Sequence, residues 1–302
     1  MNHSKNYNMS IRDFIYLEPK TMAEALEFRA MHGAKSSIIA GGTDLLVKMR
    51  AQVLQPDYVI GLNRIPGIDH INIDAGTEVV IGAMATLSLL AEHEGIINHF
   101  PALAHAASVT ATVQIRNMGT LVGNICNASP SADNATPLLV YDAQLVVVNQ
   151  AGERVVALDH FFAGPGKTIL EQGDIVKEIL IPFPGSISGS SYQKVSTRSK
   201  VDIAGICVSA LISLDSSGKV LKARIALGAV APIPMRVYKA EELLTGTVPD
   251  SELLIQAAKI AREASAPISD MRSSADYRKA MVEVLTLRAL NASLESAKQR
   301  SK

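Results

Sequence analysis

The sequence predicts an α+β protein of three units, because the pattern of apolar residues changes twice along the 302-residue chain. Residues 14–62 alternate short apolar strands with helical segments, which is typical of a small parallel α/β unit. Residues 71–82 and 144–158 each place two apolar runs around a glycine, which indicates β-hairpins. Residues 191–227 hold three strand-like runs, and helical patterns follow them. The units expected span residues 9–62, 63–182 and 183–302.

Local signals define the elements of the first unit. Thr21 is a suitable helix N-cap with a glutamate three residues later, and Gly33 ends that helical pattern. The chain then passes from an apolar run directly into Gly41 and Gly42. The remaining elements expected are a strand at 37–40, a helix at 43–49 and a strand at 57–62.

Prolines and glycines divide the rest of the chain. A helix at 100–109 has Pro101 in its first turn, and the strand at 174–181 ends at Pro182. Residues 183–191 are rich in Pro, Gly and Ser and form the best boundary. The other elements expected are a helix at 86–94, strands at 191–195, 203–214 and 221–227, and helices at 240–244, 252–264 and 277–294.

Composition excludes several classes of function. Lys and Arg together equal Asp and Glu at 29 each, so no basic excess indicates nucleic acid or an anionic membrane. No apolar run approaches the roughly 18 residues that a membrane span needs. The polar residues 1–8 lack the apolar core of a signal peptide, so we expect a cytoplasmic protein. Cys126 and Cys207 are too few to hold an iron–sulfur cluster, and the seven histidines show no metal-ligand spacing, so no metal site is expected.

Two segments of small residues are the best candidates for a binding site. Residues 40–44 read Ala-Gly-Gly-Thr-Asp, and residues 119–133 gather Gly, Asn, Ser and Asp between apolar regions. Small residues let the backbone approach a ligand closely and present free amides to it. Simpler interpretations stay open here: a plain turn capped by Thr43, a buried irregular loop, and Asp133 as a helix cap.

Two further polar segments have simple alternatives. Tyr192 and Lys194 share one face of a strand and could contact a planar ring or a phosphate, but an exposed strand edge with ordinary ion pairs is the favoured interpretation of these residues alone. Residues 164–168 end in Gly-Lys-Thr, yet Phe161 stands where a phosphate-binding P-loop has its first glycine. A turn is therefore expected at residues 164–168.

Taken together and in this order, residues 39–46, residues 114–133 and Lys194 resemble the FAD-binding subunits of the molybdenum hydroxylases. This family includes the medium subunits of bacterial xanthine, nicotinate and aerobic carbon monoxide dehydrogenases. The resemblance covers Ile11 to about Leu294. It implies the vanillyl-alcohol-oxidase-like (PCMH-type) FAD-binding fold, with two α+β subdomains that hold FAD and a C-terminal domain of a three-stranded antiparallel sheet and helices.

The resemblance also implies a set of FAD contacts and no catalytic residue. Asp133 matches an acidic ligand, Val176 an apolar flavin contact and Lys194 a basic FAD contact, while residues 198–202 match a loop near the ring where NAD docks in some members. Val122 departs from the family, which usually has glycine there; its side chain would lie beside the pyrophosphate and displace the loop slightly, while its amide donor would be retained. The residues implied to bind the pyrophosphate are Ile39, Ala40, Gly41, Gly42, Thr43, Asp44, Leu45, Leu46, Thr120, Leu121, Val122, Gly123 and Asn124.

The resemblance further implies a heterotrimeric oxidoreductase in which this flavoprotein transfers electrons. A large molybdopterin subunit would hydroxylate the substrate, and a small subunit with two 2Fe–2S clusters would pass electrons to FAD and on to NAD or another acceptor. The chain lacks the cysteine-rich insertion of members that carry an extra cluster in this subunit. Two alternatives remain: a self-sufficient flavin oxidoreductase, for which no base over the flavin is recognised, and a nonenzymatic binding module.

Overall fold

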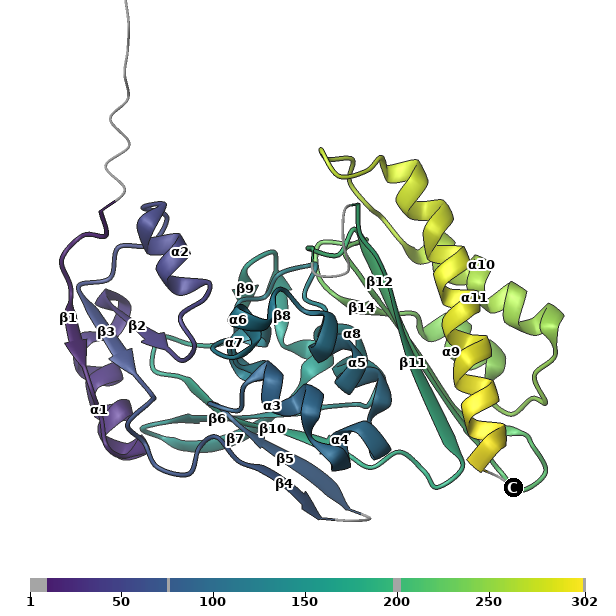
Figure 1. Ribbon diagram of the computed structural model, residues 1–302, viewed down its shortest axis with the longest axis horizontal. Helices are drawn as coiled ribbons and strands as arrows, with labels where there is room; N and C mark the ends of the chain where they lie inside the picture. Colours follow the sequence, from purple (N-terminus) through teal and green to yellow (C-terminus); the bar gives the residue numbers. More distant parts are fainter. Residues whose placement is uncertain (1–9, 75–76, 198–201, 301–302) are drawn as a thin grey trace, which may run out of the picture.

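The N-terminal unit is a three-stranded parallel sheet with α1 packed against β3. The computed structural model describes residues 10–74, 77–197 and 202–300, and its strands here follow the order β1-β3-β2 (Figure 1). The hydroxyl of Thr21 accepts a hydrogen bond from the Glu24 amide at 3.1 Å, so Thr21 is the N-cap of α1, as expected. The predicted parallel unit is thus confirmed. Its elements are β1 (Ile15–Leu17), α1 (Met22–His32), η1 (Gly33–Lys35), β2 (Ser36–Ile39), α2 (Leu45–Arg50) and β3 (Tyr58–Gly61).

The middle unit is built on a five-stranded antiparallel sheet in the order β4-β5-β10-β6-β7. Its central strand comes last in sequence, and Ile179 of that strand pairs with Ile81 on one side and Leu145 on the other. All three side chains are buried, so the hairpins at 71–82 and 144–158 become part of one core. The strands are β4 (Ile71–Asp74), β5 (Glu78–Gly82), β6 (Gln144–Asn149), β7 (Gly152–Ala157) and β10 (Ile175–Pro182).

Short helices cover this sheet, and several of them were not expected. The segment 114–124, interpreted from sequence as a loop, contains two helical turns. The helix expected at 86–94 ends at Glu92, and a further helix begins at Glu94 after His93, whose backbone is extended. Residues 164–168 form a hairpin turn as predicted. The remaining elements are α3 (Leu87–Glu92), α4 (Glu94–His99), α5 (Pro101–Val109), α6 (Val113–Arg116), α7 (Leu121–Cys126), α8 (Ala135–Val140), η2 (Leu158–His160), β8 (Phe162–Gly164) and β9 (Lys167–Thr168).

The C-terminal unit has four strands rather than the expected three. The added strand, β14, is only two residues long and follows Pro232 and Pro234, so no alternating pattern could reveal it. All nine residues of β12 are buried, because α11 covers one face of the sheet and α8 the other (Figure 1). The elements are β11 (Ser188–Val195), β12 (Ile206–Leu214), β13 (Val220–Gly228), β14 (Met235–Arg236), α9 (Tyr238–Leu244), α10 (Ser251–Ala264) and α11 (Ala275–Arg300).

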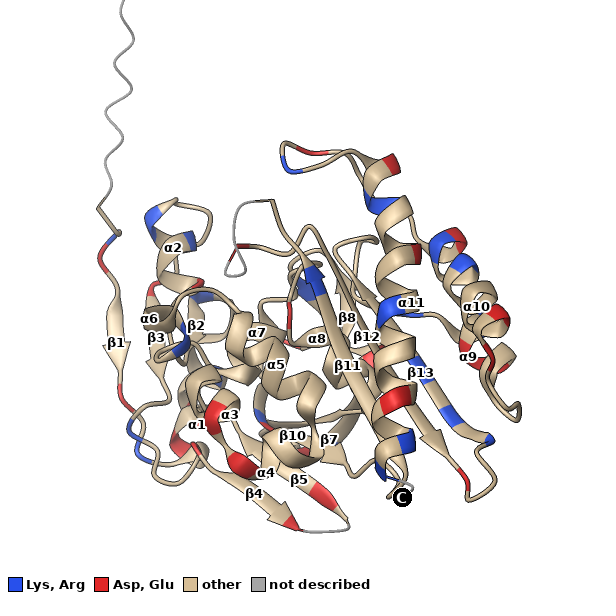
Figure 2. Ribbon diagram, turned by 45° about the vertical axis from the view of Figure 1, so that its right-hand side comes forward, with Lys and Arg blue, Asp and Glu red and all other residues tan. Residues whose placement is uncertain are grey.

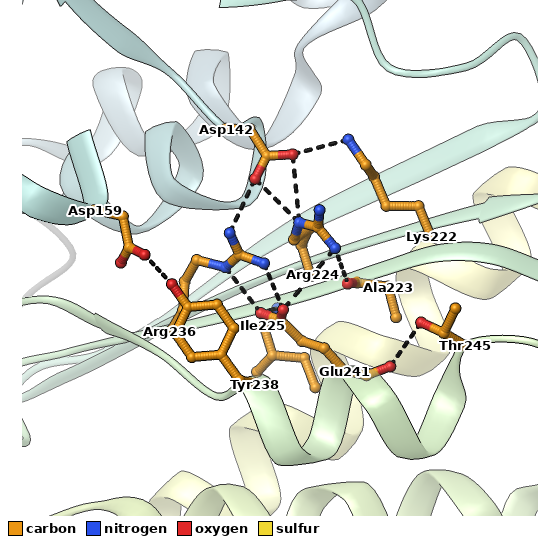
Figure 3. A network of polar contacts seen from close by, with 10 residues as sticks. All are labelled: Asp142, Asp159, Lys222, Ala223, Arg224, Ile225, Arg236, Tyr238, Glu241 and Thr245. Atoms are coloured by element: carbon orange, nitrogen blue, oxygen red, sulfur yellow. Dashed lines mark hydrogen bonds and ion pairs between the residues drawn. The ribbon is translucent and has the colours of Figure 1, made fainter. Parts of the chain in front are cut away.

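A polar network joins the middle unit to the C-terminal sheet (Figure 3). Asp142, which follows α8, accepts hydrogen bonds from Lys222 Nζ at 2.8 Å, Arg224 Nε at 3.0 Å and Arg236 Nη1 at 3.0 Å. Arg236 also binds Glu241 on α9. One carboxylate of the middle unit thus contacts cations from both β13 and β14.

Both signs of charge occur along α10 and α11 (Figure 2), in keeping with the balanced composition. None of the helices in the described ranges has the length and apolarity needed to cross a bilayer.

Candidate functional site

A cavity of about 670 Å³ lies where both small-residue segments meet. Its volume falls within the roughly 300–1,000 Å³ typical of cofactor and ligand pockets. Its walls come from the first and middle units, together with Asp202 and Ile203 from the segment between β11 and β12. Among the residues predicted from sequence, those that line it are Ala40, Gly41, Gly42, Thr43, Asp44, Leu45, Thr120, Val122, Gly123, Asn124, Asp133 and Val176.

The first loop is shaped by two glycines with different tasks. Gly42 has φ of +71°, a left-handed conformation that side chains disfavour. Gly41 lies directly against the second segment: a Cβ atom there would stand 1.9 Å from the carbonyl oxygen of Met118. The two segments therefore touch through backbone atoms, which only glycine allows at position 41.

The main-chain amides of the first loop lack partners within the protein. Across the described residues, none of the amides of residues 40–45 has a hydrogen-bond acceptor, and all six residues line the cavity. Asp44 stands at the N-cap of α2 without a side-chain cap bond, and Thr43 does not cap the helix either. A plain capped turn is therefore not what these residues form, since a turn of that kind would satisfy its own donors.

The second segment uses most of its amides internally. Thr120 begins α7, and its hydroxyl accepts the Gly123 amide at 3.0 Å. The Leu121 amide binds the Ala85 carbonyl at 3.1 Å, and the Asn124 amide binds the Thr120 carbonyl at 3.0 Å. The Val122 amide has no acceptor in the described part of the chain. The resemblance implies that the amides of residues 120–124 bind the pyrophosphate, but the amides of Leu121, Gly123 and Asn124 already have acceptors within the chain.

Val122 itself fits its position. It lies in α7 with a helical backbone, so no left-handed conformation requires glycine there. Its side chain is 5% exposed and packs in the core while also touching the cavity. The valine thus fills space beside the cavity without removing an amide.

Asp133 is a buried carboxylate at the cavity wall, bound by two side chains of β11. Lys194 Nζ lies 3.0 Å from Asp133 Oδ2, and the Tyr192 hydroxyl donates to Oδ1. Burial raises the pKa of Asp133, whereas the Lys194 charge and the Tyr192 hydrogen bond act in the opposite direction. Asp133 is not a helix cap, because Asn134 holds that position in α8, and β11 presents no exposed edge at Tyr192, which is 1% exposed.

Four predicted residues do not line the cavity. Ile39 pairs with Gly61 inside the sheet, Leu46 is partly exposed on α2, and Leu121 is fully buried in the core. The ammonium of Lys194 contacts Asp133 and the Val109 carbonyl instead. Of the segment 198–202, Arg198 lies outside the described residues, whereas Asp202 lines the cavity.

Sequence reasoning missed several wall residues. Lys48 of α2 reaches across to Asn127, with its Nζ 2.5 Å from the Asn127 Oδ1, and both line the cavity. The signal was present, since Lys48 stands four residues after Asp44 on the same helix face. Burial raises the pKa of the Cys126 thiol to about 12, so this wall cysteine is protonated rather than reactive. Arg29, Gln172 and Asp174 line the cavity as well.

Known proteins with this sequence pattern and fold are flavoprotein subunits. The profile described as "FAD binding domain in molybdopterin dehydrogenase" matches residues 9–184, and that of "CO dehydrogenase flavoprotein C-terminal domain" matches residues 191–293. The carbon monoxide dehydrogenase medium chain of Hydrogenophaga pseudoflava is 33% identical over 279 residues, covering 92% of this chain and 96% of the relative. The xanthine dehydrogenase FAD-binding subunit of Escherichia coli O157:H7 is 31% identical over 283 residues, 93% of this chain and 96% of that one.

The structural comparison agrees. The solved carbon monoxide dehydrogenase from Hydrogenophaga pseudoflava, in a form that lacks the Mo-pyranopterin moiety, matches with a TM-score of 0.91 and 33% identity, over 95% of this chain and 99% of that chain. Family, fold and cofactor class therefore converge on the expectation from sequence. The chain belongs to the FAD-binding medium subunits of the molybdenum hydroxylase family, oxidoreductase flavoproteins that include those of carbon monoxide, xanthine and nicotinate dehydrogenases.

Proposed function

We propose that this chain holds FAD in the cavity between its first two units and transfers electrons from an iron–sulfur subunit to NAD or another acceptor. The observation that carries the proposal is that residues 40–45 line a cavity of about 670 Å³ and that their amides have no acceptor within the described residues. Buried or half-buried amides without acceptors are costly, and diphosphate oxygens would satisfy them. The residues present therefore fit a dinucleotide.

Each wall supplies a different kind of contact in this proposal. The amides of Gly41 to Asp44 and the Lys48 ammonium would bind the diphosphate. The Asp133 carboxylate would accept a hydrogen bond from a hydroxyl group of FAD. Val176, which is 4% exposed, offers an apolar contact from β10. When bound, FAD supplies the electron chemistry, and the protein supplies binding, orientation and electrostatics.

Partner subunits are part of the same proposal. Among the relatives are a medium chain of carbon monoxide dehydrogenase and a subunit of xanthine dehydrogenase, whose names describe parts of larger enzymes. Exposed apolar side chains on α2, at the start of α6, just after α6 and beside the cavity support docking of an iron–sulfur subunit there: Val47, Val113, Met118 and Ile203. A molybdopterin subunit would then hydroxylate the substrate, in a complex that we expect in the cytoplasm.

A flavin spectrum tests this proposal directly. The purified chain, or its apoprotein mixed with FAD, should show bound-flavin absorbance, and a protein that cannot be reconstituted would refute the FAD site. The isolated chain should not turn over purines or aldehydes; turnover would favour the self-sufficient flavin oxidoreductase instead. Rapid mixing of reduced protein with NAD, quinone or oxygen would then identify the acceptor by the fastest reoxidation.

A further inference from the structure

Tyr192 is a buried tyrosine of β11 whose hydroxyl lies near Asp133 at the cavity wall and near Cys207 of β12. Its ring is 1% exposed and packs edge-on against His105 of α5, with ring centroids 5.7 Å apart. Its hydroxyl donates to Asp133 Oδ1. Burial raises the pKa of Tyr192 well above its ordinary value, so the hydroxyl keeps its proton and acts as a donor.

Tyr192 and Lys194 together hold the Asp133 carboxylate. Lys194 Nζ lies 3.0 Å from both Oδ1 and Oδ2, and Tyr192 adds a second donor to Oδ1. The Lys194 side chain is only 6% exposed and the Asp133 side chain 7% exposed. Two donors on β11, two residues apart, therefore fix both oxygens of one carboxylate of the middle unit. A carboxylate held in this way cannot rotate without losing a charge-assisted hydrogen bond.

We infer that Tyr192 is a positioning residue of the proposed FAD site: from the C-terminal sheet it fixes the orientation in which the Asp133 carboxylate faces the cavity. Lys194 acts through the same carboxylate, since it does not line the cavity itself. The inference rests on the proposed FAD site. It makes the C-terminal unit a functional part of a cavity that it scarcely lines.

The electrostatics give the inference a signature in pH. The titratable groups near Asp133 are Tyr192 and Lys194 on β11, the Cys207 thiol on β12 and, behind Tyr192, His105 on α5. Burial raises the pKa of the Cys207 thiol to about 12, so it stays neutral. Removing the tyrosine hydroxyl withdraws a hydrogen bond from the ionised carboxylate, which raises the pKa of Asp133 further.

The test is a fluorescence titration of apoprotein with FAD from acid to neutral pH. Tyr192→Phe should weaken FAD binding about tenfold, the value of one hydrogen bond to a charged group. The midpoint at which binding is lost on acidification should rise by about one pH unit. Tyr141→Phe is the matched control, because its hydroxyl also crosses to β11, at 2.5 Å from Ser190 Oγ, and neither Tyr141 nor Ser190 lines the cavity.

Three results would overturn the inference. The first is a Tyr192→Phe protein that binds FAD with the wild-type affinity and loses it at the wild-type pH midpoint. The second is a Tyr141→Phe protein that loses as much FAD affinity as Tyr192→Phe, which would indicate a general weakening of the interface. If Tyr192→Phe does not fold, Asp133→Asn replaces it: binding should weaken and lose its pH dependence, and a retained wild-type profile contradicts the inference. Wild-type protein that binds no FAD would instead refute the proposed function itself.

Discussion

The contact between Gly41 and the second segment makes Gly41→Ala the sharpest probe of the proposed FAD site. A Cβ atom would stand 1.9 Å from the Met118 carbonyl oxygen, whereas ordinary contact begins at 3.4 Å. The loop must therefore retreat by about 1.5 Å, and an overpacked site of this kind costs about 1–3 kcal/mol of unfolding free energy. A retreat of that size also carries an amide hydrogen bond of about 2.9 Å beyond its useful range.

The expected consequence is a loss of FAD affinity. Each hydrogen bond to a charged phosphate oxygen is worth about 1.5–3 kcal/mol, so one lost bond weakens binding at least about tenfold. Fluorescence titration of the apoprotein measures the affinity, and urea unfolding measures the stability. Gly185→Ala is the control, since a Cβ there meets nothing and φ is not in the left-handed region. If Gly41→Ala binds FAD as tightly as Gly185→Ala, the first loop is not the diphosphate site.

Three other substitutions test separate parts of the structure. Gly42→Val should lower the flavin-to-protein ratio after purification, because φ of +71° costs a side chain about 1–2 kcal/mol; an unchanged ratio contradicts it. Lys48→Gln should weaken FAD about tenfold and reduce its salt dependence, yet leave riboflavin, which has no diphosphate, unaffected; Arg50→Gln on the same helix is the control. Asp142→Asn should cost about 1–3 kcal/mol of unfolding free energy at neutral pH, measured by urea unfolding.

The Asp142 effect has a defined pH dependence. Burial raises the pKa of Asp142, but hydrogen bonds from Lys222 and Arg224 outweigh it, so the pKa is lowered on folding. A lowered pKa contributes stability above the unfolded-state value of about 3.9 and loses it as pH falls through the folded value. The difference between wild type and Asp142→Asn should thus shrink below about pH 4. A difference that stays constant into acid would show that the charge is not what stabilises the contact.

Positions of the site can be recognised from the sequence when the backbone conformation at that position favours one type of residue. The φ of Gly42 favours glycine, and Gly41 must be glycine because another backbone touches it, so both leave a visible pattern. The helical character of residues 121–126 was missed because Gly123 and Asn124 are weak helix formers; Thr120 caps the helix and tertiary packing completes it. Short-range pattern cannot foresee such packing.

Contacts between distant segments were beyond reach from sequence. Lys48 and Asn127 are 79 residues apart, and Tyr192 and Asp133 are 59 apart, so only the folded chain brings them together. The simple interpretation of Asp133 as a helix cap was wrong, because Asn134 is the N-cap and Asp133 instead binds Tyr192 and Lys194 of β11. The resemblance indicated Asp133 and Lys194 individually, but not that one binds the other.

The network of Figure 3 and the Asp133 contacts hold α8 by an acid at each end, and both sets of donors belong to the C-terminal sheet. This arrangement limits how the protein can be recombined. A chimera that takes residues 1–184 from this chain and the rest from a relative must inherit donors for both acids, whatever the fit of its apolar surfaces. The two parts of the chain are therefore expected to be exchanged among relatives only as a matched pair.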